Sequence, residues 1–190
     1  MEIRIKGERG PRPIRRPPPG DRPYTAIVDP GVYHPPELPV FARRSVQTDM
    51  VRHAKSGGAC EVGGFLLGCL CVHSGGRYLD IEVAVPALNA RGAGISLTFD
   101  NEVLREFHHV HAQRYPDKLV LGWYHSHPHH SVFLSEHDTF IHRSFFNAEH
   151  HVAVVVDPYQ PEYYDRVGVF LWEQGQISQG YHLIVYEADA

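Results

Sequence analysis

The chain has 190 residues, 43% of them hydrophobic and 21% charged, and a formal net charge of −4 at pH 7. This length suits one domain, or one domain plus a tail, and allows a sizeable core. The negative charge argues against a nucleic-acid-binding protein, and neither a secretory signal nor a membrane-length apolar stretch is present, so we expect a cytoplasmic protein without a membrane partner.

Residues 1–37 differ in composition from the rest of the chain. Residues 1–23 carry seven Lys/Arg and three Asp/Glu, so this stretch is net positive and the remainder is net negative. Ten of the fifteen prolines lie between residues 11 and 39, and proline fixes φ and removes a backbone donor. We predict an extended Pro-rich arm, either a solvated linker or a segment docked on the domain over 38–190.

The domain shows alternating helical and strand patterns. Helices are predicted where apolar residues recur at i, i+3 and i+4, and strands where β-formers alternate or run continuously between turn residues. The predicted elements are a helix over 45–58, a hairpin over 61–90 turning at 74–76, a helix over 100–115, a strand over 118–127, a helix after Ser135, a buried strand over 151–158, and strands over 165–173 and 180–187. This order predicts an α/β fold, a single mixed sheet flanked by helices.

The three cysteines, Cys60, Cys69 and Cys71, lie in or beside one apolar stretch and cannot all pair within the chain. Buried free thiols are the expected state. Cys69 and Cys71 share a strand face and are candidates for a metal clip, but a four-thiolate site needs more cysteines than the chain has.

The stretch GWYHSHPHHSVFLSEHD, residues 122–138, contains a His-x-His pair on a predicted strand. Side chains alternate along a strand, so His125 and His127 point to the same face. Pro128 ends the strand, which leaves room for the chain to loop out and return Asp138 to the pair. With fifteen histidines in the chain, the pair alone is weak evidence for a metal site, and the spacing of the acid strengthens it.

Asp138 also has a structural explanation. Ser135 and Asp138 have the spacing of a capping box, in which the serine begins the helix and the acid reaches back to it. Both roles are compatible, because capping leaves a carboxylate oxygen for a metal and places the Ser135 hydroxyl where it can donate to a developing oxyanion.

Two histidines and a carboxylate are a ligand set of the catalytic kind. Structural zinc sites use four protein ligands, whereas three ligands and a water leave the open position that hydrolysis needs. Bound to such a zinc, water has a pKa of about 7, and a general base is still required to take its proton.

The motif resembles the JAMM signature of JAB/MPN-plus zinc metalloproteases, which is His-x-His-Pro, a run of residues, then Ser-x-x-Asp. The family also uses an upstream glutamate in a Glu-x-x-Gly-x-Leu-x-Gly setting, which residues 61–68, EVGGFLLG, resemble. The resemblance covers residues from about Leu38 to the C-terminus. It implies an MPN/JAB (cytidine-deaminase-like) fold. Without the other motif residues, Glu61 would be taken as a surface acid before a strand.

The resemblance also implies roles for individual residues. His125, His127 and Asp138 are the zinc ligands, Glu61 orients and deprotonates the water, and Ser135 stabilises the tetrahedral intermediate. We expect one catalytic zinc, since Phe140 stands where related enzymes carry a histidine for a second ion.

Residues around this set have less defined roles. We expect Trp123 and Phe133 to line the approach of the substrate. His129, His130 and His137 match no ligand position and are interpreted as solvent-facing or supporting residues. His108, His109 and His111 fall on the predicted helix over 100–115, where we expect a solvated or partly packed face rather than a ligand set.

Intact members of the family hydrolyse amide or isopeptide bonds at the C-terminus of ubiquitin or ubiquitin-like proteins. The resemblance is strongest to compact bacterial JAB proteins, which act with ubiquitin-like modifiers and their activating and conjugating enzymes, including in antiviral-defence operons. We therefore expect a deubiquitinase-like isopeptidase that cleaves after the terminal glycine of a modifier, in maturation or deconjugation. Two alternatives are a peptidase acting on a sulfur-carrier protein and a catalytically silent MPN scaffold.

Overall fold

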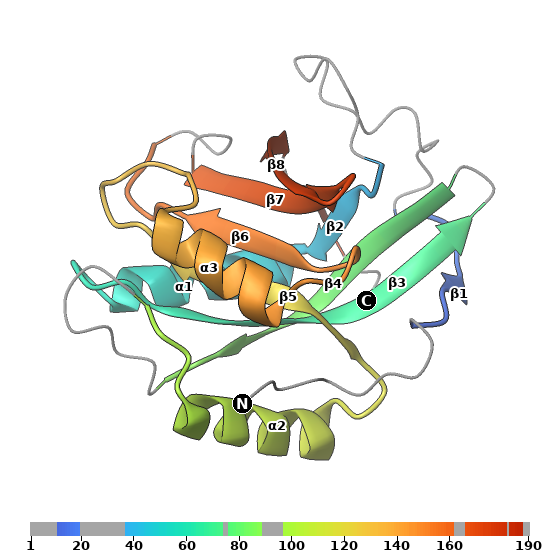
Figure 1. The fold of residues 1–190 in the computed structure, drawn as a ribbon, viewed down its shortest axis with the longest axis horizontal. Coiled ribbons are helices and arrows are strands. Elements are labelled where there is room, and N and C mark those ends of the chain that lie inside the picture. Colours follow the sequence, from blue (N-terminus) through green and yellow to red (C-terminus); the bar gives the residue numbers. More distant parts are fainter. Residues whose placement is uncertain are drawn as a thin grey trace.

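The structure, a computed structural model, describes residues 11–19, 37–73, 76–88, 97–161, 166–181 and 183–187. In chain order the elements are β1 (Ile14–Arg15), β2 (Val40–Arg43), α1 (Arg44–Ser56), β3 (Gly63–His73), β4 (Gly76–Pro86), α2 (Asn101–Arg114), β5 (Leu119–Ser126), α3 (Glu136–Phe145), β6 (Val152–Val156), β7 (Val167–Glu173), β8 (Gln176–Tyr181) and β9 (Ile184–Tyr186). The predicted α/β class with one mixed sheet is confirmed (Figure 1).

In the described part of the chain, one sheet contains nine strands, in the order β8-β7-β6-β5-β3-β4-β2-β9, with β1 paired to β3. The β5–β6, β2–β4, β2–β9 and β1–β3 pairs are parallel and the others are antiparallel. β3 and β5 form the centre of the sheet, and their antiparallel register places Gly63 opposite His125. The end of β5 is thereby held between β3 and β6 on both sides.

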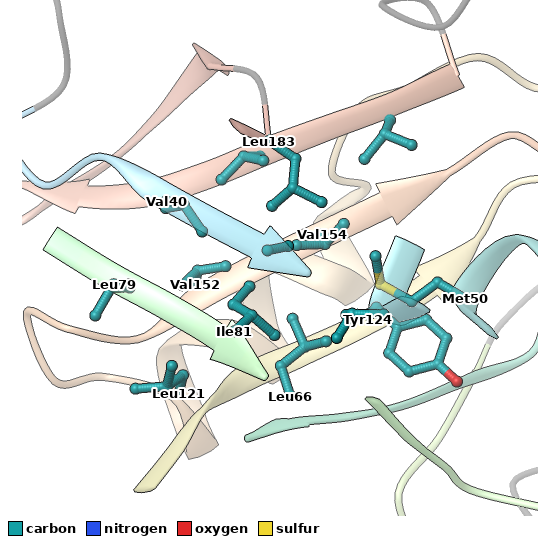
Figure 2. Packing of buried hydrophobic residues seen from close by; sticks show 14 of the residues in the cluster. Val40, Met50, Leu66, Leu79, Ile81, Leu121, Tyr124, Val152, Val154 and Leu183 are labelled. Atoms are coloured by element: carbon teal, nitrogen blue, oxygen red, sulfur yellow. The ribbon is translucent and has the colours of Figure 1, made fainter. Parts of the chain in front are cut away.

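Helices cover both faces of this sheet. α1 packs its buried residues, among them Met50, into a cluster with Leu66, Tyr124 and Val154. Figure 2 shows Val40 of β2 and Leu183 close to the β6 side chains, so the curled sheet wraps around this cluster. α2 and α3 contribute to a second cluster on the other face, which includes Trp123.

The helix boundaries follow the sequence signals. α1 ends at Ser56, and Gly58 adopts a φ of 62°, a conformation that glycine tolerates at a helix end. α2 begins where the Asp100 side chain accepts from two backbone N–H groups at 2.9 Å, and it ends before Pro116.

Two details of the prediction are wrong. Cys60 is exposed, whereas Cys69 and Cys71 are buried free thiols as expected. The structure has two strands in place of the one predicted over 180–187. β8 begins at Gln176 and forms a hairpin with β7, whereas β9 lies at the opposite edge of the sheet beside β2. The hairpin of β3 and β4 is confirmed, although residues 74 and 75 of its turn lie outside the described residues.

The described part of the arm, residues 11–19, is extended and lies against the sheet. Ile14 and Arg15 pair in parallel with the far end of β3, and Arg16 N–H donates to Val72 O at 3.2 Å. The remaining arm residues, 1–10 and 20–36, lie outside the described residues. Among the helices that the structure describes, none has the length and apolar character needed to cross a bilayer.

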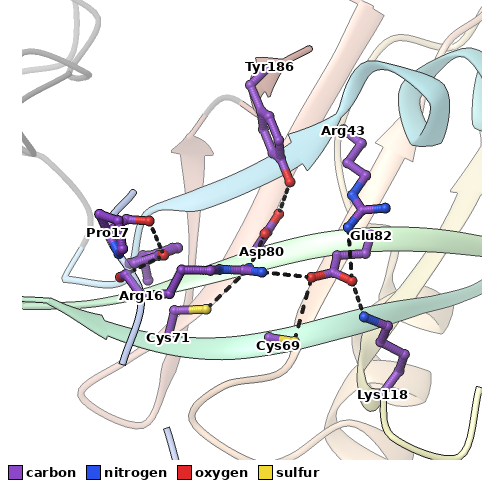
Figure 3. Close-up of polar contacts among 10 residues, drawn as sticks. Arg16, Pro17, Arg43, Cys69, Cys71, Asp80, Glu82, Lys118 and Tyr186 are labelled. Carbon is purple, nitrogen blue, oxygen red and sulfur yellow. Dashed lines mark hydrogen bonds and ion pairs between the residues drawn. The ribbon is translucent and has the colours of Figure 1, made fainter. Parts of the chain in front are cut away.

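A cluster of charged groups fastens the arm, as Figure 3 shows. The Arg16 guanidinium pairs with Asp80 and, at 3.1 Å, with Glu82, two β4 acids whose side chains are at most 2% exposed. Glu82 also pairs with Lys118 and, at 3.2 Å, with Arg43. Burial opposes ionisation of Glu82, but hydrogen bonds from Lys118 and Arg16 outweigh it and lower its pKa.

We predict that Arg16→Met destabilises the protein, because it leaves the buried carboxylates without one of their cations. Since the Arg16 side chain is about one-third exposed, we expect a loss of about 1–2 kcal/mol in the free energy of unfolding, measured by urea denaturation. Arg15→Met, at the adjacent and exposed position of the arm, is the control. Equal effects of the two substitutions would contradict the docking role of Arg16.

Candidate metal centre

The two histidines of the motif lie at the end of β5, where the backbone is held on both sides. Ser126 N–H donates to Val62 O at 2.8 Å, and His127 N–H donates to Val156 O at 3.0 Å. Period-two alternation directs both imidazoles to the face covered by α3. Their exposed fractions are 0% for His125 and 3% for His127, so both side chains are buried rather than solvent-facing.

Gly63 keeps the neighbouring strand close to these histidines. A Cβ atom at this position would lie 2.5 Å from Tyr124 O and 3.2 Å from His125 Cβ. A side chain would therefore separate β3 from β5 directly behind the site, so the glycine is required by the close approach of the two strands.

Asp138 reaches the histidines from the first turn of α3, and the predicted capping box is present. The Ser135 side chain accepts from Asp138 N–H at 3.1 Å, while Asp138 Oδ2 accepts from Ser135 N–H at 2.8 Å and from Ser135 Oγ–H at 2.6 Å. The other oxygen, Oδ1, lies 3.3 Å from His125 Nε2. Capping and ligand geometry therefore occur together, as the sequence allowed.

These three side chains form a metal-ligand group, the one such cluster found among the described residues. The Nε2 atoms of His125 and His127 are 3.0 Å apart, and Asp138 Oδ2 lies 3.5 Å from His127 Nε2. Ligand atoms about 2.05 Å from a tetrahedral zinc ion are about 3.3 Å apart, so the observed spacing fits zinc.

The electrostatics of the group also suit a metal. Burial lowers the pKa of His125, which keeps its imidazole neutral despite the nearby carboxylate. Burial opposes ionisation of Asp138, but hydrogen bonds with His125 and His127 outweigh it and hold its pKa well below the usual range. A neutral imidazole and an ionised carboxylate are the forms that bind zinc.

Glu61 lies beside this group, just before β3. Its Oε1 atom is 3.6 Å from His127 Nε2, and its side chain is 7% exposed. Burial raises the pKa of Glu61, and the neighbouring His127 offsets this only in part. A buried carboxylate with a raised pKa beside a metal group is suited to accept and return a proton.

The backbone of Leu97 is a part of the site that the sequence did not predict. Its N–H donates to Glu61 Oε2 at 3.2 Å, which leaves Oε1 directed to His127. Its carbonyl oxygen accepts from His137 Nε2 at 3.0 Å, so His137 has a structural contact. A backbone amide carries no residue-type signal, and only the fold brings residue 97 to Glu61.

The two residues expected to line the substrate approach differ in position. Phe133 is 42% exposed and its ring centroid lies 4.7 Å from that of His127, so it borders the site. Trp123 is fully buried, stacked on His125 at 4.6 Å and bonded to His142. The prediction for Trp123 is therefore wrong, because α3 covers the strand face on which the indole lies.

Asp157, at the end of β6, organises the loop after His127. Its carboxylate accepts from the N–H groups of His129 and Ser131, both at 3.2 Å, and both of these residues have positive φ. The His129 ring stacks on Tyr159 with centroids 4.1 Å apart, and His130 is exposed. These two histidines therefore contribute to the loop rather than to the ligand group.

The fold and the site together define an α/β protein in which three side chains that could hold a metal ion lie at the end of a central strand. The family model described as JAB1/Mov34/MPN/PAD-1 ubiquitin protease matches residues 43–150. The chain therefore belongs to this family, as the JAMM resemblance indicated.

Curated relatives include 26S proteasome regulatory subunit RPN11 of Eremothecium gossypii, which is 35% identical over 113 residues, or 58% of this chain and 35% of the relative. Ubiquitin carboxyl-terminal hydrolase RPN11 of Saccharomyces cerevisiae is 34% identical, over 58% of this chain and 36% of its own length. COP9 signalosome complex subunit 5 of Neurospora crassa is 35% identical, over 57% of this chain and 32% of its own. This chain thus matches about one-third of each relative.

A solved structure shares the fold. The solution structure of protein DSY2949 from Desulfitobacterium hafniense superposes with a TM-score of 0.58 at 19% identity, covering 78% of this chain and 94% of that one. At this identity the likeness concerns the fold alone.

Two further buried histidines near α3 lead to a prediction about pH. His142 is fully buried and His151 is 8% exposed, and burial lowers the pKa of His142 to about 3 and that of His151 to about 4. In the unfolded chain histidine titrates near 6.5, so between about pH 6.5 and 4 the unfolded state binds more protons than the folded state.

We predict that the free energy of unfolding falls as the pH is lowered from about 6.5 to 4, by up to about 1.4 kcal/mol per pH unit for each such histidine. Urea denaturation at several pH values measures this slope. His151→Gln removes one of the titrating groups and should flatten it, and His108→Gln, at an exposed position of α2, is the control. A slope unchanged in His151→Gln would contradict the assignment.

Proposed function

We propose that this chain is a zinc-dependent isopeptidase that cleaves after the C-terminal glycine of a ubiquitin-like modifier. The observation that carries the proposal is the position of Glu61 Oε1, 3.6 Å from His127 Nε2, beside three buried side chains with ligand atoms at zinc spacing. The family membership and the similarity to the yeast relative, a ubiquitin carboxyl-terminal hydrolase, support a modifier as substrate.

The chemistry follows from the residues around the group. If bound by His125, His127 and Asp138, zinc would act as a Lewis acid and lower the pKa of a water molecule bound to it to about 7. Glu61 takes a proton at Oε1 and returns it to the departing amine, so that water and an amide become a carboxylic acid and an amine. The Leu97 N–H holds Oε2 and thereby orients Oε1 for both transfers.

Ser135 and Phe133 complete the proposed site. The Ser135 hydroxyl donates to Asp138 in this structure, and we propose that it turns to donate to the oxyanion that develops on the scissile carbonyl. Phe133 offers an exposed apolar surface next to His127, which suits the flexible tail of a modifier. An extended tail ending in Gly-Gly has little side chain near the scissile bond, so a narrow approach suffices.

The biological setting extends this proposal. We propose a cytoplasmic role in a ubiquitin-like pathway of bacterial type, with the modifier, its conjugates and its activating and conjugating enzymes as partners. Such a pathway supplies both kinds of substrate, a precursor extended beyond its glycine and an isopeptide-linked conjugate.

We predict that the purified protein binds one zinc ion per chain, and that Asp138→Asn or His127→Ala removes stoichiometric binding. Each substitution deletes one of the three side chains that make up the ligand group, and a structural or catalytic zinc site needs at least three protein ligands. Metal analysis by mass spectrometry after dialysis gives the stoichiometry. His130→Ala, at an exposed position of the same loop, should bind as the original chain does, and a metal-free wild-type protein would argue for a scaffold.

We predict that Glu61→Gln lowers kcat by about 10²-fold or more and leaves zinc stoichiometry intact, because it removes the proton acceptor and no ligand. The assay uses ubiquitin and small ubiquitin-like proteins, each fused through the terminal glycine to a reporter peptide. Glu136→Gln, an exposed acid in the first turn of α3, is the control. Cleavage by Glu61→Gln at the wild-type rate would exclude the proposed mechanism.

A further inference from the structure

If the proposed metal centre is correct, the orientation of the His125 ring matters for metal binding. A histidine that binds a metal through one ring nitrogen usually donates a hydrogen bond from the N–H of the other, and this contact fixes the ring orientation. In the described residues, His125 Nδ1 has no hydrogen-bond partner although the ring is fully buried. Another contact must therefore orient the ring.

The indole of Trp123 provides that contact. It lies two residues before His125 on β5, hence on the same face of the sheet, and the two rings stack at 4.6 Å with planes 11° apart. A flat stack limits the tilt of the imidazole. The orientation of His125 is then only as well defined as that of Trp123.

His142 fixes the indole in turn. Trp123 Nε1–H donates to His142 Nδ1 at 3.1 Å, and both residues are fully buried. His142 lies on α3 four residues after Asp138, about one helical turn away, so both side chains face the sheet. α3 thus supplies the Asp138 carboxylate, which lies beside His125, and the His142 ring, which accepts a hydrogen bond from the indole stacked on His125.

The surroundings of His142 hold its ring in place. It stacks on Trp172 of β7, with centroids 5.3 Å apart and planes 14° apart, and packs near Phe146. Since Nδ1 accepts from Trp123, the proton of the neutral ring is on Nε2, which has no partner among the described residues. A leucine would remove that unpaired donor, so simple packing does not favour a histidine at this position.

We propose that His142 is a positioning residue that acts through Trp123 to orient His125, and so sets the affinity of the site for zinc. A purely structural role predicts different behaviour, because replacement would then change the free energy of unfolding without changing zinc affinity selectively.

Two substitutions separate the alternatives. His142→Leu keeps most of the side-chain volume and removes the acceptor, whereas His142→Asn places an amide oxygen near the position of Nδ1 and loses the stacking ring. We expect zinc affinity, measured by competition with a chromophoric chelator, to fall about 10- to 100-fold in His142→Leu and to change less than threefold in His142→Asn. The free energy of unfolding of the metal-free protein should show the opposite order, with His142→Asn the less stable.

A matched control and a double-mutant cycle complete the test. His151→Leu changes another buried histidine, whose Nδ1 accepts from Ala148 N–H rather than from Trp123, and should leave zinc affinity unchanged. Trp123→Phe removes the donor, so adding His142→Leu to it should weaken zinc binding no further.

The outcomes distinguish this inference from the proposed function. If His142→Leu binds zinc as tightly as wild type, or if His142→Asn loses as much affinity as His142→Leu, the positioning role is wrong while the metal centre stands. If the wild-type chain binds no zinc, the proposed function fails as well.

Discussion

The bond between Asp138 and the N-terminus of α3 is the constraint on which the site depends. The carboxylate accepts from Ser135 through Oδ2 and lies beside His125 through Oδ1, so a single side chain both begins the helix and completes the ligand group. A helix N-terminus favours negative charge, which helps to keep Asp138 ionised in a buried place. These hydrogen bonds also fix the end of the loop of residues 127–135 at Ser135.

The same small volume holds two carboxylates in opposite electrostatic conditions. Asp138 has its pKa lowered by the two histidines and the cap, whereas burial raises the pKa of Glu61, which has a backbone N–H at one oxygen. A metal ligand must stay ionised, and a proton carrier must bind and release a proton near neutral pH. The fold separates these roles by giving the two acids different hydrogen-bond partners.

The parts of this arrangement that the sequence predicted are those determined by local spacing. Strand alternation places His125 and His127 on one face, and the Ser135–Asp138 spacing predicts a capped helix, so both could be inferred without a fold. The side of the sheet that α3 covers depends on the tertiary structure, so the sequence predicts Trp123 at the substrate approach although it lies in the core.

The contacts of Leu97 and His142 were equally beyond local inference. The Leu97 amide is 36 residues from Glu61, and Trp123 and His142 are 19 residues apart, so neither contact leaves a local pattern. The C-terminal strands were misplaced for a related reason, since β9 pairs with β2 across more than 140 residues of chain.

The position of the arm bears on its contribution to function. β3 spans eleven residues, with Gly63 opposite His125 at one end and Val72 opposite Arg15 near the other. At about 3.3 Å per residue the two pairings are about 30 Å apart. The docked residues 11–19 therefore cannot touch the ligand group, and the ion pairs of Arg16 act on the stability of β3 and β4. Because β3 also carries Gly63 against His125, stabilising one end of this strand preserves the register that the other end gives to the site.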